Sequence, residues 1–148
     1  MKNHANYGEE NTINLKLVIA LSRSNTSFQR VLQTFFNNYD LTIAQFGVLE
    51  TLFHLGDLKI GELIDKTLST SGNMTVVIRN LEKEGLIKRQ VNVADRRAFV
   101  IGLTDEGRSL IKEVFDAHLA VLEGFFINLD QDEKKLLQKM LKKLNGLD

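Results

Sequence analysis

The chain has 148 residues, of which 43% are hydrophobic and 26% charged, and its 19 basic side chains balance 19 acidic ones. This length suits one domain with an adequate core, and no apolar run is long enough to cross a bilayer. The absence of cysteine excludes disulfides, thiolate catalysis and cysteine-based redox sensing. Because the N-terminus is polar and has no signal-peptide pattern, we expect a cytoplasmic protein.

The N-terminal third predicts three helices. Apolar residues recur at three- and four-residue steps over 12–37, which is the spacing of one helix face. Thr42 and Gln45 form a capping-box pattern that starts a second helix, and Gly56 ends it. A short third helix is expected at 60–66.

The middle of the chain predicts a helix followed by a hairpin. A turn at 67–70 leads into a helix that Ser71 or a neighbour caps and that Gly85 ends. Residues 86–91 and 98–103 are short apolar or β-branched runs on either side of a polar, charged segment, which is typical of a hairpin. Two strands alone are marginally stable, so this hairpin should pack on the helices before it.

The C-terminal part predicts two more helices. Thr104 caps the first, over 105–128, and Asp130 with Glu133 forms a capping box for the last. The 105–128 helix is apolar on more than one face, which indicates that something besides its own domain buries it. An interchain helical bundle explains this pattern, and a larger intrachain core is the alternative.

The predicted fold is therefore mainly α with a small β-hairpin wing. Residues 1–148 form one domain, in which 41–103 make a winged helix-turn-helix and 12–38 with 104–148 make a helical dimerisation region. The second helix of such a unit enters the major groove of DNA. A symmetric dimer would place two half-sites about 34–36 Å apart on a pseudo-palindromic operator.

The candidate DNA contacts are small polar groups on that helix and arginines at the hairpin tip. Between residues 79 and 97 there are six basic side chains against three acidic ones, although the whole chain is neutral. Asparagine can read adenine, arginine can read guanine or enter a narrow minor groove, and glycine lets the backbone come close. The predicted contacts are Thr70, Ser71, Gly72, Asn73, Thr75, Val76, Arg79, Arg96 and Arg97. An ordinary solvated helix face and a turn-stabilising pair of Asp95 with an arginine are the alternatives.

In this order, four segments of the sequence resemble the MarR family of bacterial regulators over nearly the whole chain. These segments are residues 41–46 (LTIAQF), 71–75 (SGNMT) running into 81–87 (LEKEGLI), 95–97 (DRR), and 103–107 (LTDEG). The resemblance implies a homodimer with interlocked terminal helices and a recognition helix in each major groove. It also implies that Arg97 enters the minor groove and that Asp95 orients it, for which a bidentate side-chain pair is the expected form. Repression is the usual mode of this family.

The resemblance further implies a small aromatic effector between the dimerisation helices and the winged part. The stretch 72–89 looks closest to members that respond to phenolic or quinone-like compounds. The candidate pocket residues are Phe28, Phe36, Phe46, Phe53, His54 and Phe115. Aromatic side chains at helical spacing are also common in hydrophobic cores. For each of these residues the alternative is therefore an ordinary core position.

Other functions have less support in the sequence. An enzyme would need a nucleophile with its base, paired carboxylates, a metal cluster or a phosphate loop, and none of these patterns appears. The three histidines are too scattered for a metal site, and no cofactor is expected. The alternatives are a winged-helix protein-interaction module without specific DNA binding, and constitutive DNA binding without an effector.

Overall fold

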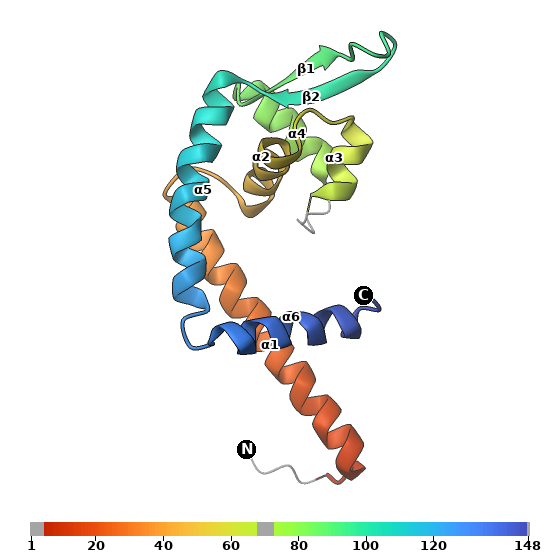
Figure 1. The fold of residues 1–148 in the computed structure, drawn as a ribbon, viewed down its shortest axis with the longest axis vertical. Helices are drawn as coiled ribbons and strands as arrows, with labels where there is room; N and C mark the ends of the chain where they lie inside the picture. The colour runs from red at the N-terminus through yellow and green to blue at the C-terminus, as the bar shows by residue number, and fades with distance from the viewer. Residues whose placement is uncertain (1–4, 68–72, 148) are drawn as a thin grey trace.

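The computed structural model describes residues 5–67 and 73–147. Helices and the hairpin follow one another as the sequence predicts (Figure 1). The elements are α1 (Gly8–Asn37), α2 (Ile43–Leu55), α3 (Ile60–Lys66), α4 (Met74–Lys83), β1 (Ile87–Val91), β2 (Phe99–Leu103), α5 (Asp105–Phe125) and α6 (Gln131–Leu144). The mainly helical fold with a two-stranded wing is confirmed.

The predicted helix caps form as hydrogen bonds. The Gln45 amide donates to the Thr42 hydroxyl at 3.1 Å, and the Thr42 amide donates to the Gln45 side chain at 2.9 Å. Asp130 and Glu133 exchange the same pair of bonds at the start of α6. Each box satisfies amides that a helix end leaves without an intrahelical partner.

Two helix ends differ from the prediction. Helix α1 begins at Gly8, four residues before the predicted start, and places Glu9 and Glu10 in its first turn. Carboxylates there are stabilised by the positive end of the helix dipole, a local signal that apolar periodicity does not contain. Helix α5 ends at Phe125 rather than at residue 128, because the chain turns there, with the Leu129 amide donating to the Phe126 carbonyl.

The core lies around α2, which is buried on most sides. Phe46, Val48, Leu49 and Leu52 are at most 4% exposed, and α1, α3, α4, α5 and β2 surround them. This packing explains how a short helix-turn-helix with only two strands is held together.

The hairpin is attached at its base to the helices. Strands β1 and β2 pair antiparallel, and Leu58 adds an isolated bridge to Ile101 on the outer edge of β2. The Thr104 hydroxyl donates to the Gly85 carbonyl at 2.7 Å and also accepts from the Gly107 amide at 3.0 Å. The end of α4, the base of the wing and the start of α5 therefore share one hydrogen-bonded junction.

Helices α1 and α6 leave many apolar side chains uncovered. Figure 1 shows α1 running away from the winged end, and α6 lying at the end of α5 opposite the hairpin. Helix α6 buries none of its residues. The exposed apolar side chains of these two helices are Ile13, Leu15, Leu17, Val18, Ile19, Leu21, Leu136, Leu137, Met140, Leu141 and Leu144. In the described ranges, no helix is long and apolar enough to span a membrane.

Candidate nucleic-acid interface and ligand cavity

Helix α4 has an apolar inner side and a polar outer side. Met74, Ile78 and Leu81 are buried, and Val77 is half-buried against the same core. Thr75, Arg79 and Lys83 follow one another at four-residue steps and are all exposed. Residues at this spacing share a helix face, so α4 presents a hydroxyl and two cations in one line.

The structure shows the position of some of the predicted DNA contacts in this part of the chain. Thr75 and Arg79 lie on the exposed face, and Val76 is half-buried beside them. Lys83 extends the same line and was not predicted, although its four-residue step from Arg79 was the signal that could have found it. The predicted contacts Thr70, Ser71 and Gly72 lie outside the residues that the structure describes.

Asn73 has a local structural role. It is the N-cap of α4, and its side-chain oxygen accepts from the Val76 amide at 3.3 Å. A bidentate contact with adenine would need this same oxygen as an acceptor, together with the amide nitrogen as a donor. The cap uses one of the two lone pairs of this oxygen, so an adenine contact would have to share the oxygen with the Val76 amide.

The hairpin tip carries Arg96 and Arg97, and both side chains are exposed. The Asp95 carboxylate accepts from the backbone amide of Arg97 at 3.0 Å, and the Asp95 carbonyl accepts from the Ala98 amide. Among the described residues the side-chain ion pair is that of Arg89 with Glu82, at 3.7 Å. The expected bidentate pair of Asp95 with the Arg97 guanidinium is therefore not formed: Asp95 holds the backbone of the turn, because a carboxylate reaches an amide two residues on more readily than a long side chain.

A cavity of about 860 Å³ lies among α1, α2 and α5. Phe28, Phe36 and Phe46, three of the six predicted pocket residues, line it. The rings of Phe36 and Phe46 stack with their centroids 4.2 Å apart. Phe36 and Phe46 are as buried as core residues, and they also border the open space of the cavity.

The other three predicted pocket residues form a separate aromatic group. The exposed His54 contacts Phe53 at 5.2 Å and Phe115 at 4.7 Å between ring centroids, and its Nδ1 lies 2.9 Å from the Glu50 carbonyl oxygen. None of the three lines the cavity described above. Phe53 and His54, at the C-terminal end of α2, contact Phe115 of α5 instead, and their role in a ligand pocket stays a prediction.

Two titratable cavity residues were missed by the sequence reasoning, besides the neutral polar residues Asn25, Gln29, Gln33 and Thr42. Glu50 lies one helical turn after Phe46, and His118 follows Val114 by four residues on the buried side of α5. Burial raises the pKa of the Glu50 carboxyl, partly offset by the nearby His54, and burial lowers the pKa of His118. The sequence signal that could have found them is a titratable side chain four residues after a buried residue of the same helix.

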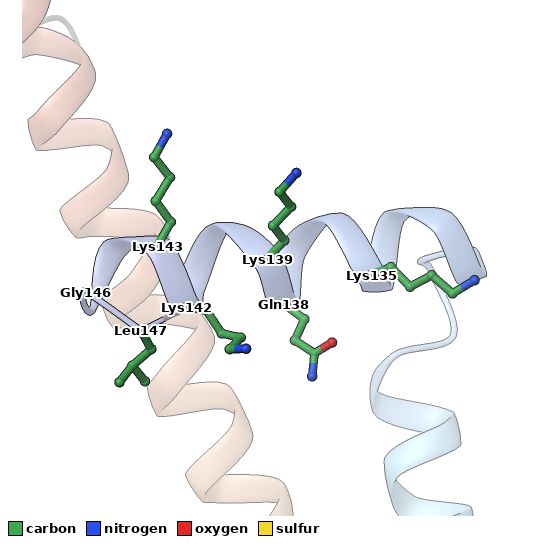
Figure 2. A pocket seen from close by; sticks show the side chains of 7 residues that line it. All are labelled: Lys135, Gln138, Lys139, Lys142, Lys143, Gly146 and Leu147. Carbon is green, nitrogen blue, oxygen red and sulfur yellow. The ribbon is translucent and has the colours of Figure 1, made fainter.

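A second, basic hollow runs along α6. Figure 2 shows its lining residues along one helix and its last turn, with Lys139 and Lys143 pointing away from Lys142 and Gln138. These side chains do not converge on a common point, so the hollow is not a candidate ligand site. The described residues also contain no cluster of three or more metal-ligating side chains.

Comparison with known proteins identifies relatives of this arrangement. The sequence model of the MarR family matches residues 41–99, which span α2 to the start of β2. The HTH-type transcriptional regulator MhqR of Bacillus subtilis (strain 168) is 32% identical over 130 residues, which are 88% of this chain and 90% of that protein.

Solved structures share the fold. BpsR of Bordetella bronchiseptica, whose DNA binding is regulated by 6-hydroxynicotinic acid, superposes with a TM-score of 0.76 at 26% identity, over 87% of this chain and 92% of that one. A mutant MarR of E. coli in complex with operator DNA gives a TM-score of 0.78 at 23% identity, over 93% and 99% of the two chains. Because the identity to this MarR is only 23%, the similarity shows a shared fold and nothing further.

Proposed function

The chain belongs to the MarR family of transcriptional regulators, and from this premise we propose that it is a repressor that binds a pseudo-palindromic operator as a homodimer. The observation that carries the proposal is the position of the exposed cations. Arg79 and Lys83 on α4, and Arg96 and Arg97 on the wing, belong to the elements that follow the core helix α2. A major-groove helix with an adjacent wing would bring both sets to one duplex.

The proposed division of labour follows the two parts of the fold. Residues 41–103 would read DNA, and 12–38 with 104–148 would join two protomers. The support for this is the row of uncovered apolar side chains on α1 and α6, since a monomer in water rarely exposes so large an apolar surface. Two-fold symmetry would then repeat α4 about one helical turn of DNA away.

We further propose that a small phenolic or quinone-like ligand releases the operator. The cavity among α1, α2 and α5 joins the proposed dimerisation helices to the core helix of the winged part. A ligand bound there would change the angle between these parts. It would thereby change the distance between the α4 helices of the two protomers. The DNA binding of BpsR is regulated by 6-hydroxynicotinic acid, a small aromatic compound, which supports a small aromatic effector here.

Selection of bound duplexes from a random pool, at two salt concentrations, tests the DNA-binding proposal. We expect enrichment of a pseudo-palindrome with half-sites about one turn apart, and an affinity that falls steeply with salt as counterions are released. If no sequence is enriched and binding stays weak at low salt, the proposal fails and a protein-interaction module is the better reading.

Replacing Asn73 separates its capping role from a contact with DNA. Because its oxygen caps α4, we expect the amide nitrogen to donate to a phosphate. Asn73→Ser keeps a cap and should weaken binding by about three- to tenfold on every sequence alike. Asn73→Ala should in addition lower the unfolding free energy by about 1 kcal/mol. A loss for Asn73→Ser confined to one base-pair position in each half-site would show base reading instead.

Replacing Asp95 tests how it orients Arg97. Asp95→Asn retains an acceptor for the Arg97 amide, so we expect operator affinity equal to or slightly above that of the wild type. Asp95→Ala removes the acceptor and should weaken binding about three- to tenfold, the value of one ordinary hydrogen bond. If both variants lose affinity equally, the negative charge and not the turn is what orients the arginine. Fluorescence anisotropy with a labelled operator measures both.

A further inference from the structure

The cavity among α1, α2 and α5 has a distinctive charge. Its aromatic wall is formed by Phe28, Phe36 and Phe46. Its polar residues include Glu50 and His118, and no lysine or arginine is present among its described lining residues. An aromatic molecule therefore meets a carboxylate there, but no cation from this protomer.

Glu50 and His118 differ in what they offer to a ligand. The Glu50 carboxylate is an acceptor of hydrogen bonds. Burial lowers the pKa of His118, which favours the neutral imidazole over a cation that would compensate the carboxylate. An anion entering this space would lie near a like charge, and the other polar lining residues, Asn25, Gln29, Gln33 and Thr42, are neutral.

His118 also has an unmet hydrogen bond. Its side chain is 7% exposed, and Nδ1 is buried without a partner in the described structure. The ring is packed against Phe46 and Phe36, with centroid distances of 4.9 and 5.6 Å. His118 therefore lines the cavity chiefly as an aromatic ring in contact with Phe46 and Phe36.

We propose that this cavity selects an uncharged aromatic hydrogen-bond donor, of the phenol class, and rejects aromatic carboxylates, with Glu50 as the residue that sets this selection. The inference rests on the proposed ligand control of operator binding and specifies its chemistry. A phenol ionises near pH ~10 and enters neutral, whereas a benzoate is an anion at pH 7. The BpsR effector, 6-hydroxynicotinic acid, carries a carboxyl group, so the two proteins are expected to differ in whether they accept a negatively charged ligand.

The test compares two probes of similar size, 4-ethylphenol and 4-methylbenzoate, on the full-length protein. Calorimetric titration gives each dissociation constant, and ring and methyl NMR signals report whether the probe sits against Phe36 and Phe46. The wild type should bind the phenol at least about tenfold more tightly than the benzoate. Glu50→Gln should bring that ratio to within about threefold of one, because an amide no longer repels the anion. Glu113→Gln removes the same charge from an exposed position of α5 outside the cavity, and should leave the ratio unchanged.

Three outcomes would overturn the inference: equal or tighter binding of the benzoate by the wild type, a ratio in Glu50→Gln equal to that of the wild type, or no binding of either probe in the cavity. The affinity for the operator is measured in parallel without probe. If operator binding persists in any of these three cases, the selectivity inference has failed and the proposed DNA binding has not. Selective phenol binding that leaves operator affinity unchanged would support the cavity's selectivity and refute ligand control.

Discussion

Arg97→Ala is expected to weaken operator binding by at least about tenfold per wing, and by more in a dimer that loses both side chains. The Arg97 side chain is exposed at the hairpin tip, where its backbone is fixed by Asp95 and its guanidinium has no side-chain ion pair in the described structure. It is thus free to enter a narrow minor groove, whose negative potential favours a cation. Anisotropy titration with a labelled operator gives the loss directly.

Because the side chain is fully outside the core, the substitution should leave the melting temperature and the oligomeric state unchanged. Arg30→Ala is the matched control, since Arg30 is an exposed arginine on α1, outside the segment 41–103 that is proposed to read DNA. It removes the same charge and should change operator affinity less than about threefold. Equal affinities for Arg97→Ala and the wild type would remove the wing tip from the mechanism.

Leu144→Glu is expected to weaken dimerisation by about a hundredfold or more, because it buries an unpaired carboxylate in both protomers of a symmetric interface. Leu144 is 64% exposed in the single chain and lies on the apolar side of α6 with Leu137, Met140 and Leu141. Operator binding should fall with it, since a single reading head engages one half-site. Sedimentation velocity over a concentration series measures the first effect, and anisotropy measures the second.

Gln138→Glu provides the control on the same helix. It introduces the same charge on the polar side of α6, where Gln138 and Lys142 point the same way (Figure 2), and should leave dimerisation intact. A wild type that sediments as a monomer at micromolar concentration would contradict the proposed dimer. So would a Leu144→Glu variant that associates as tightly as Gln138→Glu.

The order and type of the secondary-structure elements could be predicted from local signals. The capping pairs of Thr42 with Gln45 and of Asp130 with Glu133 marked helix starts to the residue, since the same hydrogen bonds recur wherever the pattern does. Gly85, which has a φ of 76°, marked the end of α4. The start of α1 was missed because charge near a helix end, and not periodicity, determines it.

The candidate site was less predictable because it depends on which helices meet. Nothing local to the sequence shows that Phe46 meets both Phe36 of α1 and His118 of α5, while Phe53, two helical turns later, meets Phe115 of α5. The relation of Glu50 and His118 is likewise tertiary, as they are 68 positions apart in the printed sequence. Asn73 was assigned to DNA from its residue type, and Asp95 was assigned to a side-chain pair with Arg97. The structure adds the hydrogen bonds that both side chains make to backbone amides.

Hydroxyl-radical footprinting on a duplex enriched from a random pool tests the central claim most directly. Two symmetric regions of protection, with centres about one helical turn apart, are the predicted result for a dimer that reads DNA with α4. Flanking minor-groove protection, present in the wild type and absent in Arg97→Ala, would place the wing there. A single unsymmetric region, or uniform protection that disappears at moderate salt, would contradict the account.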